Sequence, residues 1–156
     1  MTTTINLKKL LTALMLPMGV FALSVLSSPG KAAEYARLSK PPLAPGAWML
    51  ILVWAAVYLL SGLACYIATD RKIRTNDPAA KLYLVFLSLS FLWTPLFFNL
   101  RLHVLSLIIL ILLWLAAFLT MIRFRILSRP AGSLMTPAVI WISYLAYMNI
   151  GVVFLN

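Results

Sequence analysis

The chain has few residues that could perform acid–base or metal chemistry. Its 156 residues include one cysteine, Cys65, one histidine, His103, and three acids, Glu34, Asp70 and Asp77. A single cysteine excludes an internal disulfide and a cysteine-rich zinc cluster. The three acids fall in predicted loops, so no carboxylate pair and no Ser-His-Asp set can be assembled. We therefore expect no catalytic residue and no metal site.

Charge is also scarce, at 10% of the residues, whereas 63% are hydrophobic and the mean hydropathy is +1.01. A soluble domain is about half apolar and a quarter charged, so this chain is too apolar for water. The formal net charge of +10 would suit nucleic acid. However, the cations lie in short loops and form no basic face interleaved with aromatics. Such loops are typical of membrane proteins, and we expect no nucleic-acid partner.

Five apolar runs have the length that crosses a bilayer, at roughly residues 10–28, 47–68, 82–100, 104–122 and 134–155. They predict an all-α integral membrane protein, a bundle of five transmembrane helices forming one domain over residues 1–156. The first run also fits a cleaved signal peptide. Its length, and Lys31 shortly before Glu34, favour a retained helix.

The loops between the runs contain strong breakers. In the first loop, the prolines from Pro41 to Pro45 predict extended and turn backbone and exclude a regular helix. Between the last two runs, Pro130 and Gly132 predict a break. The connection over residues 99–103 is short, so the third and fourth helices should form an antiparallel pair.

The lysines and arginines are distributed unequally between the two ends of the predicted bundle. The N-terminus, second loop and fourth loop hold nine of the 13, and the remaining segments hold four. Basic loops remain in the cytoplasm. In a bacterial cell membrane the N-terminus would therefore be cytoplasmic and the proline-rich first loop would face outward.

Polar and aromatic residues inside the runs recur with helical spacing. They form three stripes: Trp54, Tyr58, Ser61 and Cys65; Ser90, Trp93, Thr94, Phe97 and Arg101; and Pro137, Trp141, Tyr144 and Met148, with Asn149 at the edge. One interpretation is that the stripes are helix-packing faces with aromatic anchors. The other is that three tryptophans converge on a flat, π-rich pocket. Asn149 fits a helix–helix hydrogen bond as well as a ligand contact.

The third run is interrupted by Trp93-Thr94-Pro95. Pro95 leaves the carbonyl of Phe91 without its helical donor, a cost that neighbouring groups must offset in lipid. Thr94 is available to bond back into the preceding turn. We expect a bend that shifts Trp93 and Phe97 and opens room in the bundle.

The chain resembles the TspO/translocator protein family, also called tryptophan-rich sensory protein or peripheral-type benzodiazepine receptor. The resemblance lies in YARLSKPPLAPGAWMLILVW, FLWTPLFF and TPAVIWISYLAYMN, in that order and spacing, and covers residues 10–156. It implies a five-helix bundle, often a homodimer, with a ligand cavity capped by the first loop. Members bind porphyrins such as protoporphyrin IX, and several bind sterols or benzodiazepine-type drugs.

The resemblance also implies roles for residues. Trp54 and Trp141 match tryptophans that face the cavity, and Trp141 matches one associated with light-dependent porphyrin breakdown. Tyr35, Lys40, Pro41 and Pro45 match the lid, and core motif positions are matched by Trp93, Thr94, Pro95, Phe97, Phe98 and Asn149. We add Tyr58 and Ser90 as candidate ligand contacts. Arg37 or Lys40 would meet ligand propionates, and Thr94, Pro95 and Pro137 would shape the helices.

This sequence departs from the family pattern in places. A lid tryptophan is replaced by Leu43, an asparagine of the third helix by Ser90, and a tyrosine of the fifth helix by Ala138. No basic residue follows Tyr144 or Tyr147, so we do not expect sterol binding through the pattern cited near the C-terminus. The stretch LACYIATDR matches another sterol pattern, which is too common to support a site.

Three functions remain open. The leading hypothesis is a membrane receptor, carrier or sensor for a tetrapyrrole-like ligand, porphyrin or haem in type, with no other cofactor. The second is a porphyrin-modifying, photo-oxidative protein that uses tryptophan as a redox partner. The third is a regulatory partner of another membrane protein with a vestigial cavity.

Overall fold

The computed structural model describes residues 6–69 and 77–156, and the regular elements in these two ranges are all α-helices. In chain order they are α1 (Leu7–Leu26), α2 (Lys31–Arg37), α3 (Ala47–Thr69), α4 (Pro78–Phe98), α5 (His103–Leu127) and α6 (Arg129–Leu155). Most of the predicted second loop, including Asp70 and the cations Arg71, Lys72 and Arg74, lies outside the described residues.

Five of the described helices, α1 and α3 to α6, are long and apolar enough to cross a bilayer. The predicted all-α bundle of five spanning helices is thereby confirmed, and the chain is an integral, multi-pass membrane protein. The helices α1 and α4 begin a few residues before the predicted runs because their first turns contain lysine. Asn6 and Asp77 cap these turns, each accepting a backbone N–H with its side chain.

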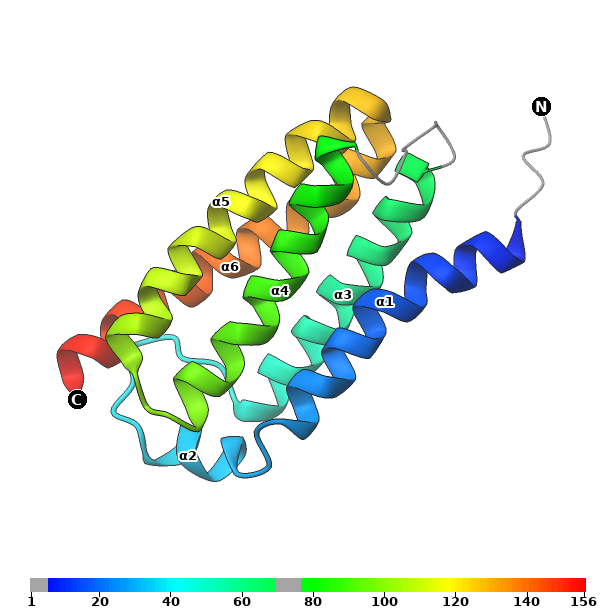
Figure 1. Ribbon diagram of the computed structural model, residues 1–156. Coiled ribbons are helices and arrows are strands. Elements are labelled where there is room, and N and C mark those ends of the chain that lie inside the picture. The colour runs from blue at the N-terminus through cyan, green and yellow to red at the C-terminus, as the bar shows by residue number, and fades with distance from the viewer. Residues whose placement is uncertain (1–5, 70–76) are drawn as a thin grey trace.

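The spanning helices are arranged around an interior in the order α1, α3, α6, α5 and α4, and α4 packs on α1 to complete the ring. Helices α3 and α4 meet through aromatic side chains in this interior. Gly62 lets α1 approach α3 closely, since a Cβ there would lie 2.9 Å from side-chain atoms of Leu14 and Pro17. Figure 1 shows the start of α1 and the end of α6 at opposite ends of the bundle, with α2 at the end that holds the C-terminus.

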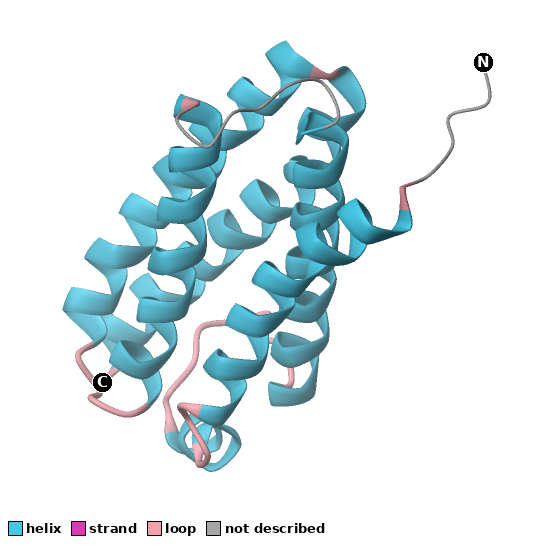
Figure 2. Cartoon of the chain, turned by 45° about the vertical axis from the view of Figure 1, so that its right-hand side comes forward, coloured by secondary structure: helices cyan, strands magenta, loops and turns pink. Residues whose placement is uncertain are grey.

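The first loop contains a short helix, so the expectation of a loop without regular helix was wrong in part. Helix α2 has the sequence KAAEYAR and lies between the prolines of the loop, starting after Pro29 and ending at Arg37, before Pro41. Proline disfavours helix at its own position and at the residue before it. The restriction from Pro41 therefore does not extend to the residues of α2. The prediction holds for the rest of the loop, which is non-helical up to Ala47 (Figure 2).

The break predicted at Pro130 and Gly132 was also misplaced. Helices α5 and α6 are separated by Ser128 alone, and both predicted breakers lie inside α6. Pro130 occupies the first turn, where its missing N–H has no helical partner to lose. Gly132 instead permits contact between the helices, because a Cβ there would lie 2.4 Å from Cβ of Arg125.

Helix α4 continues through Pro95 as far as Phe98, and α6 continues through Pro137, which is exposed on its surface. The bend expected at Pro95 therefore stays a prediction. Among the described residues, the hydroxyl of Thr94 has no hydrogen-bond partner, so it does not bond back into the preceding turn. It lines an interior cavity instead.

Candidate functional site

A cavity of about 40 Å³ lies between α1, α3 and α4 beneath α2. Its walls are mainly aromatic, from Phe21, Tyr35, Trp54, Tyr58, Trp93 and Phe98. Its polar lining consists of Ser24, Lys31 and Thr94, together with the tyrosine and tryptophan polar atoms. Pockets that hold small molecules measure about 300–1,000 Å³. In this conformation the interior is therefore closed around its own aromatic side chains.

A second void of about 10 Å³ lies on the α6 side of the first. The two voids share four lining residues, Tyr35, Leu50, Trp93 and Phe98, and the second is bounded also by Phe97, Leu145, Met148 and Asn149. The two voids therefore adjoin, and Trp93 belongs to the lining of both.

The aromatic side chains form a continuous series across the bundle. Tyr58 lies 5.5 Å from Trp54 between ring centroids, Trp54 lies 6.1 Å from Trp93, and Trp93 stacks on Phe97 at 5.3 Å. Phe21 of α1 continues the series beyond Tyr58 at 5.7 Å. Such tilted and offset pairs are favourable arrangements of aromatic rings. The series presents π surfaces from three helices to the interior.

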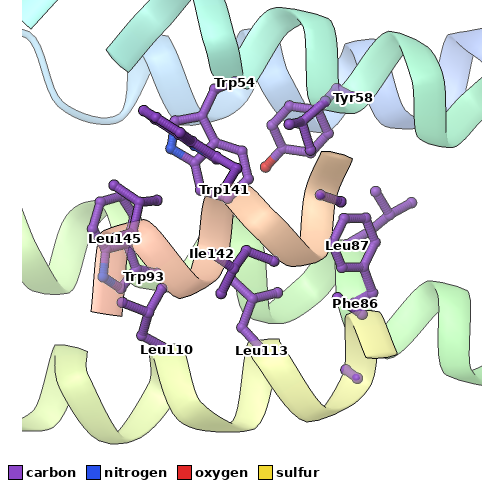
Figure 3. Close-up of a cluster of buried hydrophobic side chains, with 14 of the residues drawn as sticks. Trp54, Tyr58, Phe86, Leu87, Trp93, Leu110, Leu113, Trp141, Ile142 and Leu145 are labelled. Carbon is purple, nitrogen blue, oxygen red and sulfur yellow. The ribbon is translucent and has the colours of Figure 1, made fainter. Parts of the chain in front are cut away.

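The indole N–H groups of Trp54 and Trp141 are buried, and within the described residues neither has a hydrogen-bond acceptor. The two side chains are only 8% and 9% exposed. Figure 3 shows them on α3 and α6, directed into the interior that Trp93 of α4 also enters. A buried donor without a partner costs about 1–3 kcal/mol. These donors would gain from an acceptor atom brought in by a ligand.

Asn149 joins three helices. With its amide oriented to suit its neighbours, its oxygen accepts from Ser106 Oγ at 2.9 Å and from Trp93 Nε1 at 3.3 Å, and its nitrogen donates to the His103 carbonyl at 3.0 Å. Its side chain is 1% exposed. Of the two interpretations of Asn149, the structure shows the helix–helix hydrogen bond, and this bond fixes the indole of Trp93.

Tyr58 and Ser90 form a similar link between α3 and α4. The Tyr58 hydroxyl donates to Ser90 Oγ at 2.9 Å, and that oxygen donates in turn to the Leu87 carbonyl at 2.7 Å. Tyr58 lines the cavity, whereas Ser90 supports it from behind. Trp141 lines neither described void and stacks on Tyr144 at 5.5 Å.

Helix α2 and the proline-rich segment after it, which together form the lid of the prediction above, are joined to each other by Tyr35. The Tyr35 hydroxyl donates to the Pro45 carbonyl at 2.8 Å, and burial raises the pKa of this phenol to about 12. The Lys40 ammonium donates to the carbonyls of Tyr35 and Leu38 at 2.7 and 2.8 Å and lies 4.9 Å from the Tyr35 ring centroid. Lys40 therefore acts as a C-terminal cap of α2. Arg37 is exposed.

The lid is fastened to the C-terminal part of α6 by a row of contacts. Tyr144 and Tyr147 donate their hydroxyls to the carbonyls of Leu43 and Pro42. The Asn156 side chain bonds both the N–H and the carbonyl of Ser39, at 3.0 and 2.9 Å. Pro41 is buried against Gly151, where a Cβ would lie 2.4 Å from its ring.

The lid is also tied to the turn between α4 and α5. Glu34 of α2 pairs with Arg101 at 2.7 Å, and next to this contact Asn99 donates to the carbonyl of Ser27, the residue after α1. Leu43, at the position where the resemblance implies a tryptophan in the family, is 85% exposed and has a φ of 69°. Its side chain points away from the cavity, so a larger residue in this conformation would not cover the interior.

Lys31 is a site residue that the sequence interpretation missed. It stands on α2, lines the cavity, and burial lowers its pKa from the usual 10.5. The sequence prediction placed Arg37 or Lys40 at the mouth, where either would meet ligand propionates. Lys31 is the first residue of α2, a helix that the sequence did not predict. Its position in this helix directs the Lys31 side chain toward the cavity.

Comparison with known proteins agrees with this architecture. The family model described as TspO/MBR family matches residues 11–155. The chain is 31% identical over 124 residues to the tryptophan-rich protein TspO of Chlorobaculum tepidum, covering 78% of each. It is 31% identical over 139 residues to protein CrtK of Rhodobacter capsulatus, covering 86% of this chain and 84% of the relative. Against the translocator protein of Ovis aries it is 31% identical over 118 residues, covering 74% and 70%. The chain belongs to the TspO/MBR family.

Proposed function

We propose that this membrane protein is a receptor, carrier or sensor for a flat, apolar ligand of the tetrapyrrole type that carries carboxylates. The observation that carries the proposal is the pair of buried indole donors, Trp54 and Trp141, which have no acceptor among the described residues. Relatives bear the names sensory protein and translocator protein, which fit a receptor or a carrier.

The aromatic walls of the interior favour a ligand that is flat and apolar. The series from Tyr58 through Trp54 to Trp93 offers ring faces to a planar molecule. Each aromatic contact adds about 0.5–1.5 kcal/mol beyond the burial of its area. Pyrrole-type nitrogens and peripheral oxygens could supply the acceptors that the two indoles lack.

The carboxylate requirement follows from Lys31. It is the one cation among the described residues that line the cavity. A ligand carboxylate beside this ammonium would offset its loss of hydration. Lys40, whose ammonium is held by two carbonyls, supports the lid instead of the ligand.

Entry requires the interior to expand, because a cavity of about 40 Å³ is too small for a drug-sized molecule. The Tyr35 hydrogen bond to Pro45 and the tyrosine contacts to α6 would open as the lid lifts. We infer that the closed structure is the resting state and that ligand selects a more open one.

Titration of the purified protein with protoporphyrin IX, followed by the shift of its absorption band, tests the proposal. Trp54→Phe and Trp141→Phe should each weaken binding about tenfold, since each removes one donor. Trp114→Phe is the control, because Trp114 already donates to Ser143 Oγ on the α5–α6 surface. Equal affinity in the parent and in all three variants, or no binding by the parent, would overturn the proposal.

The orientation in the membrane is also proposed. Lys8, Lys9, Lys81 and the arginines of the α5–α6 junction gather at one end of the bundle, opposite α2. Basic residues favour the cytoplasmic side, so α2 and the lid would face outward in a bacterial cell membrane. Reporter fusions after residue 156 that are active only outside the cytoplasm support this orientation. The homodimer implied by the family resemblance stays a prediction.

A further inference from the structure

A groove of about 580 Å³ lies at the basic end of the bundle, far from the lid. The N-terminal half of α1 forms one side and α3 and α4 form the other, and Figures 1 and 2 show this half of α1 leaning away from its neighbours. The walls are apolar, with Ala13, Leu16 and Leu84 on the sides and the buried rings of Tyr83 and Phe124 on the floor. The groove shares no lining residue with the tryptophan-lined cavity.

The rim of the groove offers hydrogen-bond donors and positive charge. Lys8 and Lys9 stand at its edge. The Tyr66 hydroxyl accepts the N–H of Asn6 at 3.1 Å, which leaves its own proton available for another acceptor. Thr69 also lines the rim, but its hydroxyl donates to the Cys65 carbonyl in its own helix. None of the lining residues described by the structure is acidic.

A ligand that suits this groove has an apolar body and an anionic head. The groove is built from membrane-spanning helices, so its apolar walls lie at the level of lipid chains. Its basic rim lies where a span meets the headgroup layer, and basic pockets between spans at that level attract anionic headgroups. A free anion would leave the apolar walls uncovered, and a zwitterionic lipid would gain less from the cations.

We propose that this groove binds one molecule of an anionic phospholipid. An acyl chain lies along Leu16 and Leu84 above the rings of Tyr83 and Phe124. The phosphate lies at the rim, where Lys8 and Lys9 supply charge and Tyr66 donates a hydrogen bond. The bound lipid fills the space between the diverging half of α1 and the rest of the bundle. This inference does not depend on the function proposed for the tryptophan-lined cavity.

Cys65 provides a direct test, since it lines the groove and is the only cysteine of the chain. The rate at which a small membrane-permeant maleimide labels Cys65 is measured in detergent during titration with phosphatidylglycerol. Phosphatidylcholine with the same chains and inorganic phosphate are titrated in parallel. We expect phosphatidylglycerol alone to slow labelling at low lipid concentration. Equal protection by phosphatidylcholine, or protection by phosphate alone, would overturn the proposal.

Variants locate the headgroup. The double variant Lys8→Gln and Lys9→Gln should raise the half-protecting concentration of phosphatidylglycerol roughly 10- to 30-fold, because each lysine near an anionic lipid contributes a similar increment. Tyr66→Phe should raise it by a smaller factor. Arg123→Gln is the matched control, an exposed cation in α5 near the same end of the bundle but outside the groove. If Arg123→Gln has the same effect as the lysine pair, the headgroup is not held at this rim.

A second measurement separates loss of the site from loss of the fold. Ala80→Trp places an indole inside the groove and should lower the amount of phosphatidylglycerol retained in native mass spectrometry. The helical circular dichroism and the labelling rate without lipid confirm that each variant is folded. Retention of phosphatidylglycerol by Ala80→Trp at the parent level would contradict the assignment of the groove.

Discussion

Tyr35 donates its hydroxyl to the carbonyl of Pro45 across ten residues of chain, at 2.8 Å. This bond joins α2 to the end of the proline-rich segment and closes the lid on itself. Because Tyr35 also lines both interior voids, the residue that closes the lid is in contact with the space beneath it. A movement of this segment would therefore change the lining of the interior through one side chain.

Tyr35→Phe should loosen the lid without emptying the core. The phenyl ring stays, but the Pro45 carbonyl loses its donor, at a cost of about 1 kcal/mol. Hydrogen exchange of residues 38–46 should become faster, while exchange of α5 stays unchanged. Tyr66→Phe removes a phenol at the opposite end of the bundle and serves as the control. Unchanged protection of the lid in Tyr35→Phe would show that this bond does not hold it closed.

Gly151→Ala should force the lid away from α6. The new Cβ would lie 2.4 to 2.8 Å from three ring atoms of Pro41, too close for the loop to remain in place. Overpacking of this kind costs about 1–3 kcal/mol and should lower the thermal unfolding temperature. Gly19→Ala is the matched control, because nothing lies within 4 Å of its new Cβ. Replacing glycine by alanine inside a helix stabilises it by up to about 1 kcal/mol. A lower unfolding temperature in both variants would therefore contradict the explanation by contact with Pro41.

Asn149→Leu should destabilise the protein by about 2–3 kcal/mol. It leaves the buried Trp93 indole without its acceptor and removes the amide that links α6 to Ser106 and His103, which keep their hydrogen bond to each other. Chemical unfolding in detergent measures the change. Ser133→Ala, which removes an exposed α6 hydroxyl that bonds only the Arg129 carbonyl of its own helix, should have a smaller effect. A stability equal to the parent would mean that the three groups find other partners.

Affinity for a porphyrin dicarboxylate should depend on the protonation of Lys31. Burial lowers the pKa of this lysine below 10.5, so the cation is lost at a lower pH than for an exposed lysine. Binding of the dicarboxylate should therefore weaken as the pH rises through this lowered value, whereas binding of the dimethyl ester should not. Lys31→Met should remove the pH dependence, and Lys40→Met should keep it. A pH dependence that survives in Lys31→Met would assign the carboxylate to another group.

Much of the fold was predictable from the sequence, because hydrophobic length alone identifies membrane spans. The five spans were predicted in this way, and the short connection over residues 99–103 predicted the antiparallel pair of α4 and α5. The misplaced break at Pro130 and Gly132 shows the limit of residue propensities. Both residues break helices in isolation, yet one fits a first helical turn and the other permits close contact with Arg125. That distinction depends on where a helix begins and what packs on it.

The candidate site was likewise predictable from the sequence only in part. Helical spacing grouped Trp54 with Tyr58 and Trp93 with Phe97, and these side chains do meet in the interior. The sequence by itself determined the membrane class, the number of spans and the aromatic character of the interior, because these follow from composition and periodicity along the chain. Only the tertiary structure decided that Asn149 holds Trp93 and that Lys31 faces the cavity. Such relationships depend on the rotation of each helix about its axis, and packing between distant segments sets that rotation.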